Sequence, residues 1–200
     1  MKLRIVGGSL KRRVMEVKGG LDDFRPTLER TREALAESLK TRIFGASVVD
    51  LCAGSGIFGF EMLSRGAAYV HFVEDHRGRA AAIKSISRRF GVEQQCRVIV
   101  SDVDKFLQRT QDLYDIIYFD PPYDVEGLAA LLPEVVTHLS DGGICLYEHR
   151  KGDGHECLID RQEGVESRHR NYGRTRVDFI TRVAPLNRNT VSDVRSKDDD

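Results

Sequence analysis

The residues best suited to chemistry are Asp120, Pro121, Pro122 and Tyr123, which stand together as one tetrapeptide. Asp120 offers a carboxylate acceptor, the prolines offer carbonyl groups, and Tyr123 offers an aromatic face. This set fits a flat, neutral amine, because the oxygens accept from its N–H groups while a ring stacks on its plane. The same residues are also typical of a turn that ends a strand, and both interpretations stay open.

The segment before the tetrapeptide indicates where it lies. Residues 114–119 are apolar, aromatic and β-branched, which predicts a buried strand. The two prolines end that strand, since neither has an N–H to donate and each favours extended geometry in the residue before it. We therefore expect the tetrapeptide at the carboxyl end of a strand, where open α/β sheets bind their ligands.

A glycine turn follows another predicted strand, over residues 47–52. The turn and the helix after it match the fingerprint GxGxxG through Ala53, Gly54, Ser55, Gly56 and Gly59. Glycine lets a ligand approach the backbone closely, but this pattern alone does not identify the ligand. A pyrophosphate requires a turn free of negative charge, whereas Asp50 precedes this turn by four residues. The acid favours a cationic, phosphate-free nucleoside such as S-adenosylmethionine.

Acidic residues also follow the other predicted strands. Glu74 is expected to accept hydrogen bonds from both ribose hydroxyls, and Asp102 from the adenine amine. With Asp50 and Asp120, they give four acids at four strand ends, a set that suits a cation. Each acid alone is equally well explained as a loop carboxylate or a helix cap.

The apolar pattern predicts an α/β fold. Strands alternate with helices from residue 47 to residue 147, which is typical of a Rossmann-like, mostly parallel sheet. Alternation over 165–170 and 177–183 predicts an antiparallel hairpin at the C-terminal edge, and 3–6 with 13–17 predicts an N-terminal β-hairpin. The helices are expected over 28–43, 57–65, 77–90, 104–109 and 128–139, with a turn at 141–143. The predicted units are a basic hairpin extension (1–20), the α/β domain (21–183) and a flexible tail (184–200).

Charge is balanced in total but uneven along the chain. The protein has 31 Lys and Arg and 31 Asp and Glu, yet residues 1–42 hold 11 of the basic and 6 of the acidic residues, a net of 11 − 6 = +5. This favours a polyanionic partner for the N-terminal arm, although a solvated surface also explains it. The four cysteines form no C-x-x-C pair, and neither a signal peptide nor a long apolar run is visible. We expect a cytoplasmic, reduced, soluble monomer without a membrane partner.

Several motifs together resemble the RsmD family, bacterial methyltransferases that act on N2 of one guanine in 16S ribosomal RNA. They cover roughly residues 3–183 and are residues 4–8 (RIVGG), 25–27 (RPT), 32–35 (REAL), 50–56 (DLCAGSG), 63–67 (LSRGA), 120–123 (DPPY) and 172–173 (YG). Three positions depart from the family's usual residues: Ala36, where an aromatic is common, His76, where an acid often occurs, and Ile86, where an Asn is usual.

The resemblance implies a Rossmann-like S-adenosylmethionine-dependent methyltransferase fold, with a seven-stranded sheet and an antiparallel C-terminal edge strand. S-adenosylmethionine is then the cofactor, S-adenosylhomocysteine the product, and 16S RNA or a small-subunit assembly particle the partner. The implied catalytic residues are Asp120, Pro121, Pro122 and Tyr123, and the cofactor residues are Asp50, Ala53, Gly54, Ser55, Gly56, Glu74, Asp102 and Asp120. The candidate RNA-binding cations are Arg4, Lys11, Arg12, Arg13, Arg25 and Arg32.

Three other functions remain to be weighed. An adenine-N6 methyltransferase uses the same tetrapeptide, but 200 residues leave little room for a target-recognition domain. A nicotinamide-dependent oxidoreductase matches GxGxxG, but Asp50 argues against a pyrophosphate. A non-catalytic RNA-binding module explains the basic arm but not the strand-end acids. Metal binding is not expected, because His149, His155 and Cys157 are loosely spaced among Gly and Asp.

Overall fold

The computed structural model describes residues 2–16, 28–122, 127–153, 158–159 and 162–183. The strands are β1 (Lys2–Arg4), β2 (Val14–Glu16), β3 (Ser47–Leu51), β4 (Tyr69–Glu74), β5 (Cys96–Val100), β6 (Tyr114–Phe119), β7 (Leu139–Arg150), β8 (Val165–Tyr172) and β9 (Thr175–Arg182). The α-helices are α1 (Leu28–Ser38), α2 (Lys40–Ile43), α3 (Ile57–Ser64), α4 (Arg77–Phe90), α5 (Val103–Arg109) and α6 (Leu132–Thr137), with short 3₁₀ turns η2 (Glu93–Gln95) and η3 (Ala129–Leu131).

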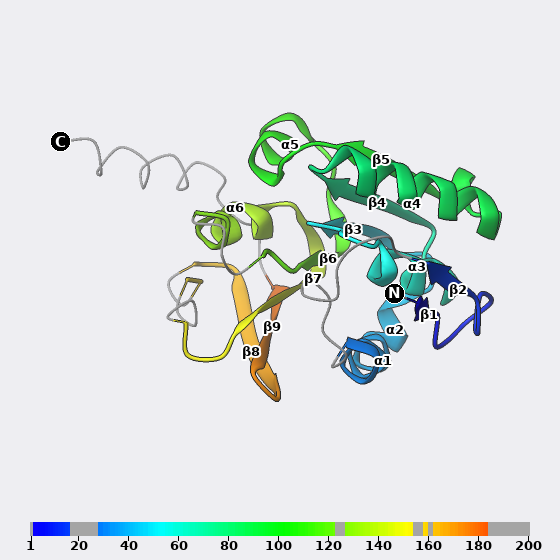
Figure 1. Cartoon of the computed structure of the whole chain (residues 1–200). Coiled ribbons are helices and arrows are strands. Elements are labelled where there is room, and N and C mark those ends of the chain that lie inside the picture. Colours follow the sequence, from blue (N-terminus) through cyan, green and yellow to red (C-terminus); the bar gives the residue numbers. More distant parts are fainter. Residues whose placement is uncertain (1, 17–27, 123–126, 154–157, 160–161, 184–200) are drawn as a thin grey trace.

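Seven strands form one sheet in the order β5-β4-β3-β6-β7-β9-β8, as Figure 1 shows from the green strand at the top to the orange hairpin at the bottom. The strands from β5 to β7 are parallel, whereas β9 pairs antiparallel with β7 and with β8. The predicted fold class and the antiparallel C-terminal hairpin are confirmed. A dinucleotide-binding domain has the strand order 3-2-1-4-5-6, counted along its own chain. In this protein β9 is inserted between β7 and β8, which distinguishes the sheet from that fold.

Helices and apolar clusters cover both faces of the sheet. One cluster packs α1, α2, α3, α4 and the N-terminal hairpin on one face, and a second packs α5 and α6 on the other. Burial on both faces explains why the central strands are almost continuously apolar. Among the described helices, none has both the length and the apolar character needed to cross a bilayer.

Two predicted helices differ from the structure. The expected helix over 28–43 is divided at Leu39, whose φ of −100° and ψ of −1° leave regular helix, next to a Ser38 hydroxyl that donates to the Leu35 carbonyl (2.7 Å). The expected helix over 128–139 is a 3₁₀ turn followed by the short α6, and Leu139 already begins β7. The apolar pattern alone could not show where these helices end, because a short apolar run fits a helix or a strand.

The turn predicted at 141–143 lies inside β7. Gly142 has φ +73°, and the pairing register with β6 shifts between Tyr114 and Ile116. A side chain at Gly143 would put its Cβ 2.9 Å from the Tyr114 carbonyl oxygen. The glycines therefore make a bulge that bends the strand rather than ending it.

Candidate functional site

The sheet has its switch point at β3. From β3 the chain moves through β4 to β5 on one side, and β6 and β7 then add to the other side of β3. In open α/β sheets the ligand lies outside the carboxyl ends of the strands at this point. The glycine turn after β3 is thus a neighbour of Asp120, Pro121 and Pro122 after β6, at the carboxyl edge where the sequence predicts the tetrapeptide.

The backbone of the glycine turn is left-handed at three residues. Cys52, Gly54 and Gly56 have φ of +58°, +56° and +73°. A Cβ at Gly54 would meet little, with only one carbonyl oxygen at 3.8 Å, whereas a Cβ at Gly59 would lie 2.2 Å from the Phe72 ring. The fingerprint therefore combines two roles: Gly54 presents open backbone at the sheet edge, and Gly59 lets α3 pack on β4.

Asp50 faces the protein interior, whereas the sequence predicts that it faces the ligand. Its side chain is 1% exposed, and Oδ2 accepts a hydrogen bond from the Gly59 N–H at 3.0 Å. Gly59 is in the first turn of α3, where N–H groups have no partner within the helix, and the cap residue Gly56 has no side chain to offer. Burial raises the pKa of Asp50 well above its ordinary value. Asp50 thus anchors α3 beneath the glycine turn.

Glu74 joins two strand ends. Its Oε2 accepts from the Gly54 N–H at 2.7 Å, and Oε1 accepts from the His76 N–H at 3.0 Å. The side chain is 3% exposed, and Arg79 approaches Oε1 at 3.6 Å. Burial raises the pKa of Glu74, and the two backbone hydrogen bonds offset part of that rise. The carboxylate is held rigidly against the turn, with lone pairs left for further donors.

Asp102 caps α5. Its Oδ1 accepts from the Lys105 N–H and its Oδ2 pairs with the Lys105 ammonium, both at 2.9 Å. The Lys105 hydrogen bond lowers the pKa of Asp102, so the acid is ionised at neutral pH. Its side chain is 41% exposed, which leaves it accessible at the edge of the sheet. The helix-cap interpretation holds for this acid, and it does not exclude contact with a ligand.

The tetrapeptide begins one residue past β6. Asp120 is half-buried, Pro121 is buried and Pro122 is exposed, while Tyr123 lies outside the described residues. Burial raises the pKa of both Tyr118 and Cys52, and in each case the charge of Asp120 adds to the rise. The Asp120 carboxylate therefore lies within electrostatic range of both groups. Cys52 is held as a neutral thiol, which agrees with a packing role rather than that of a nucleophile.

Glu148 is a site neighbour that sequence reasoning missed. The buried Tyr118 hydroxyl donates to Glu148 Oε2 at 2.7 Å, and the Tyr118 ring stacks on Phe58 at 3.9 Å between centroids. Glu148 is 4% exposed and directly follows the last residue of the predicted strand over 144–147. An acid directly after a predicted strand could have identified Glu148 as a site residue, since the other strand ends also bear acids.

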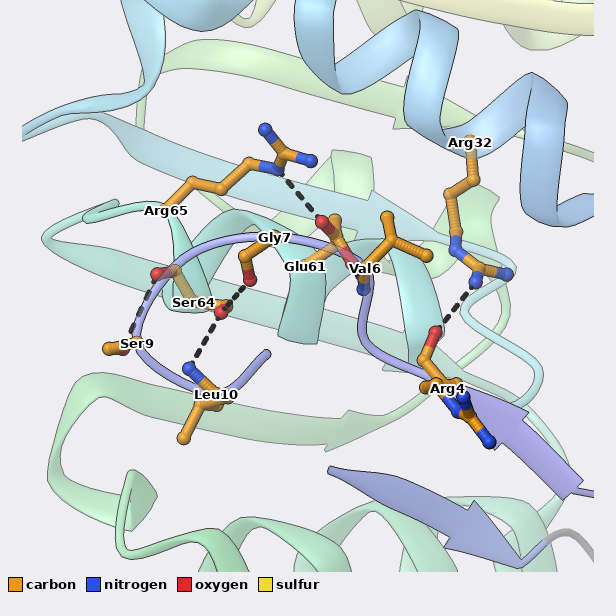
Figure 2. Close-up of polar contacts among 9 residues, drawn as sticks. All are labelled: Arg4, Val6, Gly7, Ser9, Leu10, Arg32, Glu61, Ser64 and Arg65. Carbon is orange, nitrogen blue, oxygen red and sulfur yellow. Dashed lines mark hydrogen bonds and ion pairs between the residues drawn. The ribbon is translucent and has the colours of Figure 1, made fainter. Parts of the chain in front are cut away.

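The N-terminal arm (residues 2–16) is anchored through buried polar groups, as Figure 2 shows. Glu61, which is 0% exposed, accepts from the Val6 N–H at 2.9 Å and from Arg65 Nε at 2.8 Å. The Ser64 hydroxyl accepts from the Leu10 N–H at 2.9 Å and donates to the Gly7 carbonyl. The apolar side chains of Ile5, Leu10 and Met15 join the core. The predicted hairpin is confirmed, and its loop is fixed on α3.

The cations in the loop of the arm lie far from the carboxyl edge. Lys11, Arg12 and Arg13 are exposed, but their loop contacts Ser64 at the C-terminal end of α3. Arg13 lies over the Phe90 ring at 5.8 Å, at the C-terminal end of α4. Because α3 and α4 start at the site, their lengths of about 12 Å and 21 Å separate these cations from it.

Arg32 is buried, contrary to its expected place on an RNA-facing surface. It is 5% exposed, and Nη2 donates to the Arg4 carbonyl at 2.9 Å, between α1 and the arm (Figure 2). Nε and Nη1 have no protein partner among the described residues. Burial lowers the pKa of Arg32, while Glu61 counteracts the fall. Arg4 itself is exposed, and Arg25 lies outside the described residues.

The comparisons with known proteins identify the family. A family model described as "Conserved hypothetical protein 95" matches residues 3–181. The chain belongs to the RsmD family. Escherichia coli Ribosomal RNA small subunit methyltransferase D is 33% identical over 144 residues, covering 71% of this chain and 69% of that protein. The protein of the same name from Buchnera aphidicola is 32% identical over 123 residues, 61% of this chain and 63% of that one.

Solved structures agree with this membership. Escherichia coli yhhF has a TM-score of 0.78 at 26% identity, covering 92% of this chain and 99% of that chain. A Thermus thermophilus 16S rRNA N2 methyltransferase, RsmC, in complex with AdoMet and guanosine, has a TM-score of 0.69 at 23% identity, covering 92% and 50%. At 23% identity, the similarity to RsmC shows a shared fold only. The relatives' names support an RsmD-family methyltransferase of ribosomal RNA.

The positions that depart from the RsmD pattern have structural roles. Ala36 is fully buried and Ile86 is 6% exposed, and both belong to the apolar cluster beneath α1 and α4. His76 caps α4, since its Nδ1 accepts from the Arg79 N–H at 3.2 Å. None of these departures removes one of the strand-end acids.

Metal binding finds no support in the described part of the chain, where no group of three or more candidate ligands converges. His149, one of the residues considered, is bound instead by two carboxylates: Nδ1 lies 3.0 Å from Asp153 and Nε2 lies 3.0 Å from Asp178. His155 and Cys157 lie outside the described residues.

Proposed function

We propose that this protein transfers a methyl group from S-adenosylmethionine to the exocyclic N2 amine of a guanine in 16S ribosomal RNA. The observation that carries the proposal is the position of Asp120, Pro121 and Pro122, directly beyond β6 and beside the glycine turn. Membership of the RsmD family supports the same reaction.

The carboxylates and the open glycine turn fit S-adenosylmethionine better than a dinucleotide. Because Gly54 has no side chain, a ligand can approach the backbone of the turn closely at this position. Glu74, fixed by two backbone N–H groups, is proposed to accept from the ribose hydroxyls, and the exposed end of Asp102 from the adenine amine. Ala53, Ser55 and Gly56 complete the proposed cofactor contacts. Asp50 is proposed to act indirectly, by holding α3 and the turn in position.

S-adenosylmethionine supplies an electrophilic methyl group when bound, and the protein must orient the amine that receives it. The guanine amine is a poor nucleophile because its lone pair is delocalised into the ring. Asp120 and the Pro121 carbonyl are proposed to accept its two N–H groups, which directs the lone pair outward, and Tyr123 is proposed to stack on the base. Such positioning contributes on the order of 7–11 kcal/mol of barrier reduction. Asp120 need not be a strong base, since the amine becomes acidic as it is methylated.

The proposed RNA contacts include the exposed cations of the arm, Arg4, Lys11, Arg12 and Arg13. They are proposed to bind phosphates, which gives affinity without reading sequence. Because Lys11, Arg12 and Arg13 are separated from the carboxyl edge, these three are proposed to contact the RNA away from the target nucleotide. The target base itself must be unstacked, which costs a few kcal/mol unless it already lies in a loop.

The deciding experiment offers labelled S-adenosylmethionine and small-subunit RNA that lacks the modification, free and as particles, followed by nucleoside mass spectrometry. The expected product is N2-methylguanosine. N6-methyladenosine would instead assign the adenine reaction, and binding of NAD without any S-adenosylmethionine signal in calorimetry would overturn the proposal. Asp120→Ala should nearly abolish turnover with cofactor affinity within a few fold, whereas Glu74→Ala should weaken cofactor binding by about 1.5–3 kcal/mol.

A further inference from the structure

The C-terminal hairpin, β8–β9, ends at the same sheet edge as Asp120. Glu148 of β7 pairs with Val177 of β9, and Val177 pairs with Arg170 of β8. Phe119 pairs with Tyr147, so continuing that register puts Asp120 level with Glu148. Arg170 and Asp120 therefore lie in one row, separated by three strand spacings, or about 14 Å.

The hairpin also presents its arginines on the face of the sheet that bears Tyr118. Arg168 pairs with Phe179, which pairs with Leu146, and Leu146 pairs with Tyr118. Successive residues of a strand point to opposite faces, so Arg168 and Arg170 share one face with Tyr118. Asp120, two residues after Tyr118, continues this alternation at the end of β6.

Two arginine side chains of β8 lie over this end of the sheet. Arg168 and Arg170 lie over the Phe179 ring with their guanidinium carbons 5.0 and 5.8 Å from its centroid. Phe179 is 1% exposed, whereas every residue from 166 to 171 is exposed. The N–H groups of an exposed arginine that lies over a ring remain available to other partners. This is the presentation that bidentate recognition of a phosphate requires.

More cations gather at the hairpin tip. Arg174, in the turn between the strands, is exposed, and its carbonyl accepts from the N–H of Lys151, which is also exposed. Glu166, the acid on the same face of β8, is at the opposite end of the strand from this tip. We call Lys151, Arg168, Arg170 and Arg174 the C-terminal basic patch.

We propose that the C-terminal basic patch binds the RNA backbone on the side of the target nucleotide opposite to the N-terminal arm. This rests on the proposed function, since it names a second contact for the same substrate. The site is lined by carboxylates, which repel a polyanion, so RNA that brings a base to Asp120 needs cations close by to hold its phosphates. Lys11, Arg12 and Arg13 are at the far ends of α3 and α4, whereas Arg170 of the patch lies in the row of Asp120.

The test uses Arg168→Gln/Arg170→Gln in the full-length chain, because glutamine keeps a stem over Phe179 while it removes the charge. Arg97→Gln/Arg109→Gln is the matched control: both residues are exposed, and the net charge changes equally. Arg168→Lys/Arg170→Lys keeps the charge but removes the planar fork. Circular dichroism and the urea midpoint verify folding of each variant.

Filter binding of transcribed small-subunit RNA at several salt concentrations is the main measurement. The glutamine pair should bind roughly tenfold more weakly, and its slope of log affinity against log salt should fall by about 0.7–0.9 for each phosphate that the variant no longer neutralises. The lysine pair should keep the slope, and the control pair should resemble the unaltered chain. An unchanged slope in the glutamine pair, or an equal fall in both glutamine pairs, overturns the patch.

Methyl transfer separates this inference from the proposed function. For the glutamine pair, KM for RNA should rise while kcat at saturating RNA stays the same. If the unaltered chain binds RNA through the patch but transfers no methyl group, the proposed function fails and the patch stands. If it transfers the methyl group and the glutamine pair matches it in KM and salt slope, only the patch fails.

Discussion

The two β-hairpins of this protein both carry exposed cations but are held in different ways. The N-terminal hairpin forms a separate two-stranded sheet and is fixed by buried polar contacts to Glu61 and Ser64. The C-terminal hairpin extends the main sheet, so its pairing with β7 places it in register with the end of β6, three strand spacings from Asp120. The role of a basic segment therefore depends on its position as well as its charge. One hairpin contacts the ends of α3 and α4 remote from the site, and the other reaches the carboxyl edge of the sheet.

The difference in anchoring predicts different costs of mutation. Buried charges and donors are costly to leave unpaired, whereas the removal of exposed guanidinium groups changes stability little. Changes at the arm's anchor should therefore affect both stability and RNA binding. Changes at the C-terminal basic patch should affect RNA binding alone.

The largest effect is expected for Glu61→Ala. It leaves the Val6 N–H and the mostly buried Arg65 without their carboxylate, which should lower the free energy of unfolding by about 3–5 kcal/mol. Urea denaturation followed by circular dichroism measures this. Glu61→Gln keeps one acceptor and the shape, so it should cost less; equal losses in both variants would show that charge and hydrogen bonding do not explain the anchor.

Gly8→Ala should displace the arm loop. The added Cβ would fall 1.7 Å from the Ser64 carbonyl oxygen at a φ of +72°, and we expect a loss of about 3 kcal/mol. Gly45→Ala is the control, because Gly45 has a φ of +76° with nothing within 4 Å of the added Cβ. It should show only the cost of left-handed backbone, about 1–2 kcal/mol. Denaturation midpoints that agree for the two variants would contradict close packing of the arm on α3.

His149→Gln tests the polar contacts under the C-terminal hairpin. Burial would lower the pKa of His149, but hydrogen bonds to Asp178 and Asp153 outweigh it and raise the pKa. For Asp178, burial acts to raise the pKa, yet hydrogen bonds from His149 and Arg176 lower it. A histidine whose pKa is raised on folding stabilises the fold fully below its unfolded pKa of about 6.5, and this contribution disappears as pH rises through the folded pKa.

The expected loss for His149→Gln is about 1.5–3 kcal/mol near pH 6, since two charge-assisted hydrogen bonds are removed. The loss should be smaller at pH 9 than near pH 6, because the stabilisation by a histidine of raised pKa disappears as pH rises through its folded pKa. Urea midpoints at the two pH values decide this. A variant that is destabilised equally at both values would mean that the ring matters only through packing.

The smallest effect is expected for Arg168→Gln/Arg170→Gln on stability. Both side chains are exposed, so the free energy of unfolding should change by no more than about 0.5 kcal/mol. Thermal and urea denaturation measure the change. A loss as large as that of Glu61→Ala would remove the contrast between the two hairpins.

Much of this fold can be predicted from local pattern. The bounds of α4 match the prediction because Gly91 ends the helix with a left-handed C-cap, and β6 matches because the prolines end it. The Gly142 bulge was mistaken for a turn, since the same glycine suits both and only pairing with β6 distinguishes them. Strand order is also invisible locally, which is why Glu148 was not linked with Asp120.

The candidate site was predicted by position but not by contact. Acids at strand ends were recognised, yet the sequence could not show that Asp50 accepts from Gly59 or that Glu74 accepts from Gly54. These partners are nine and twenty residues away, and they meet only when α3 packs on the sheet and β3 pairs with β4. Arg32 was misjudged for the same reason, because the chain that covers it comes from the arm.

The separation in sequence between the arm and its anchor has a consequence for synthesis. Ser9 and Ser64 are 55 residues apart, so the arm has no place to dock until α3 has been translated and has emerged. Contacts of such long range form late and slowly. During that interval the arm is a nascent, positively charged segment without its partner. The C-terminal hairpin, by contrast, is made of neighbouring residues and can pair with β7 as soon as it leaves the ribosome.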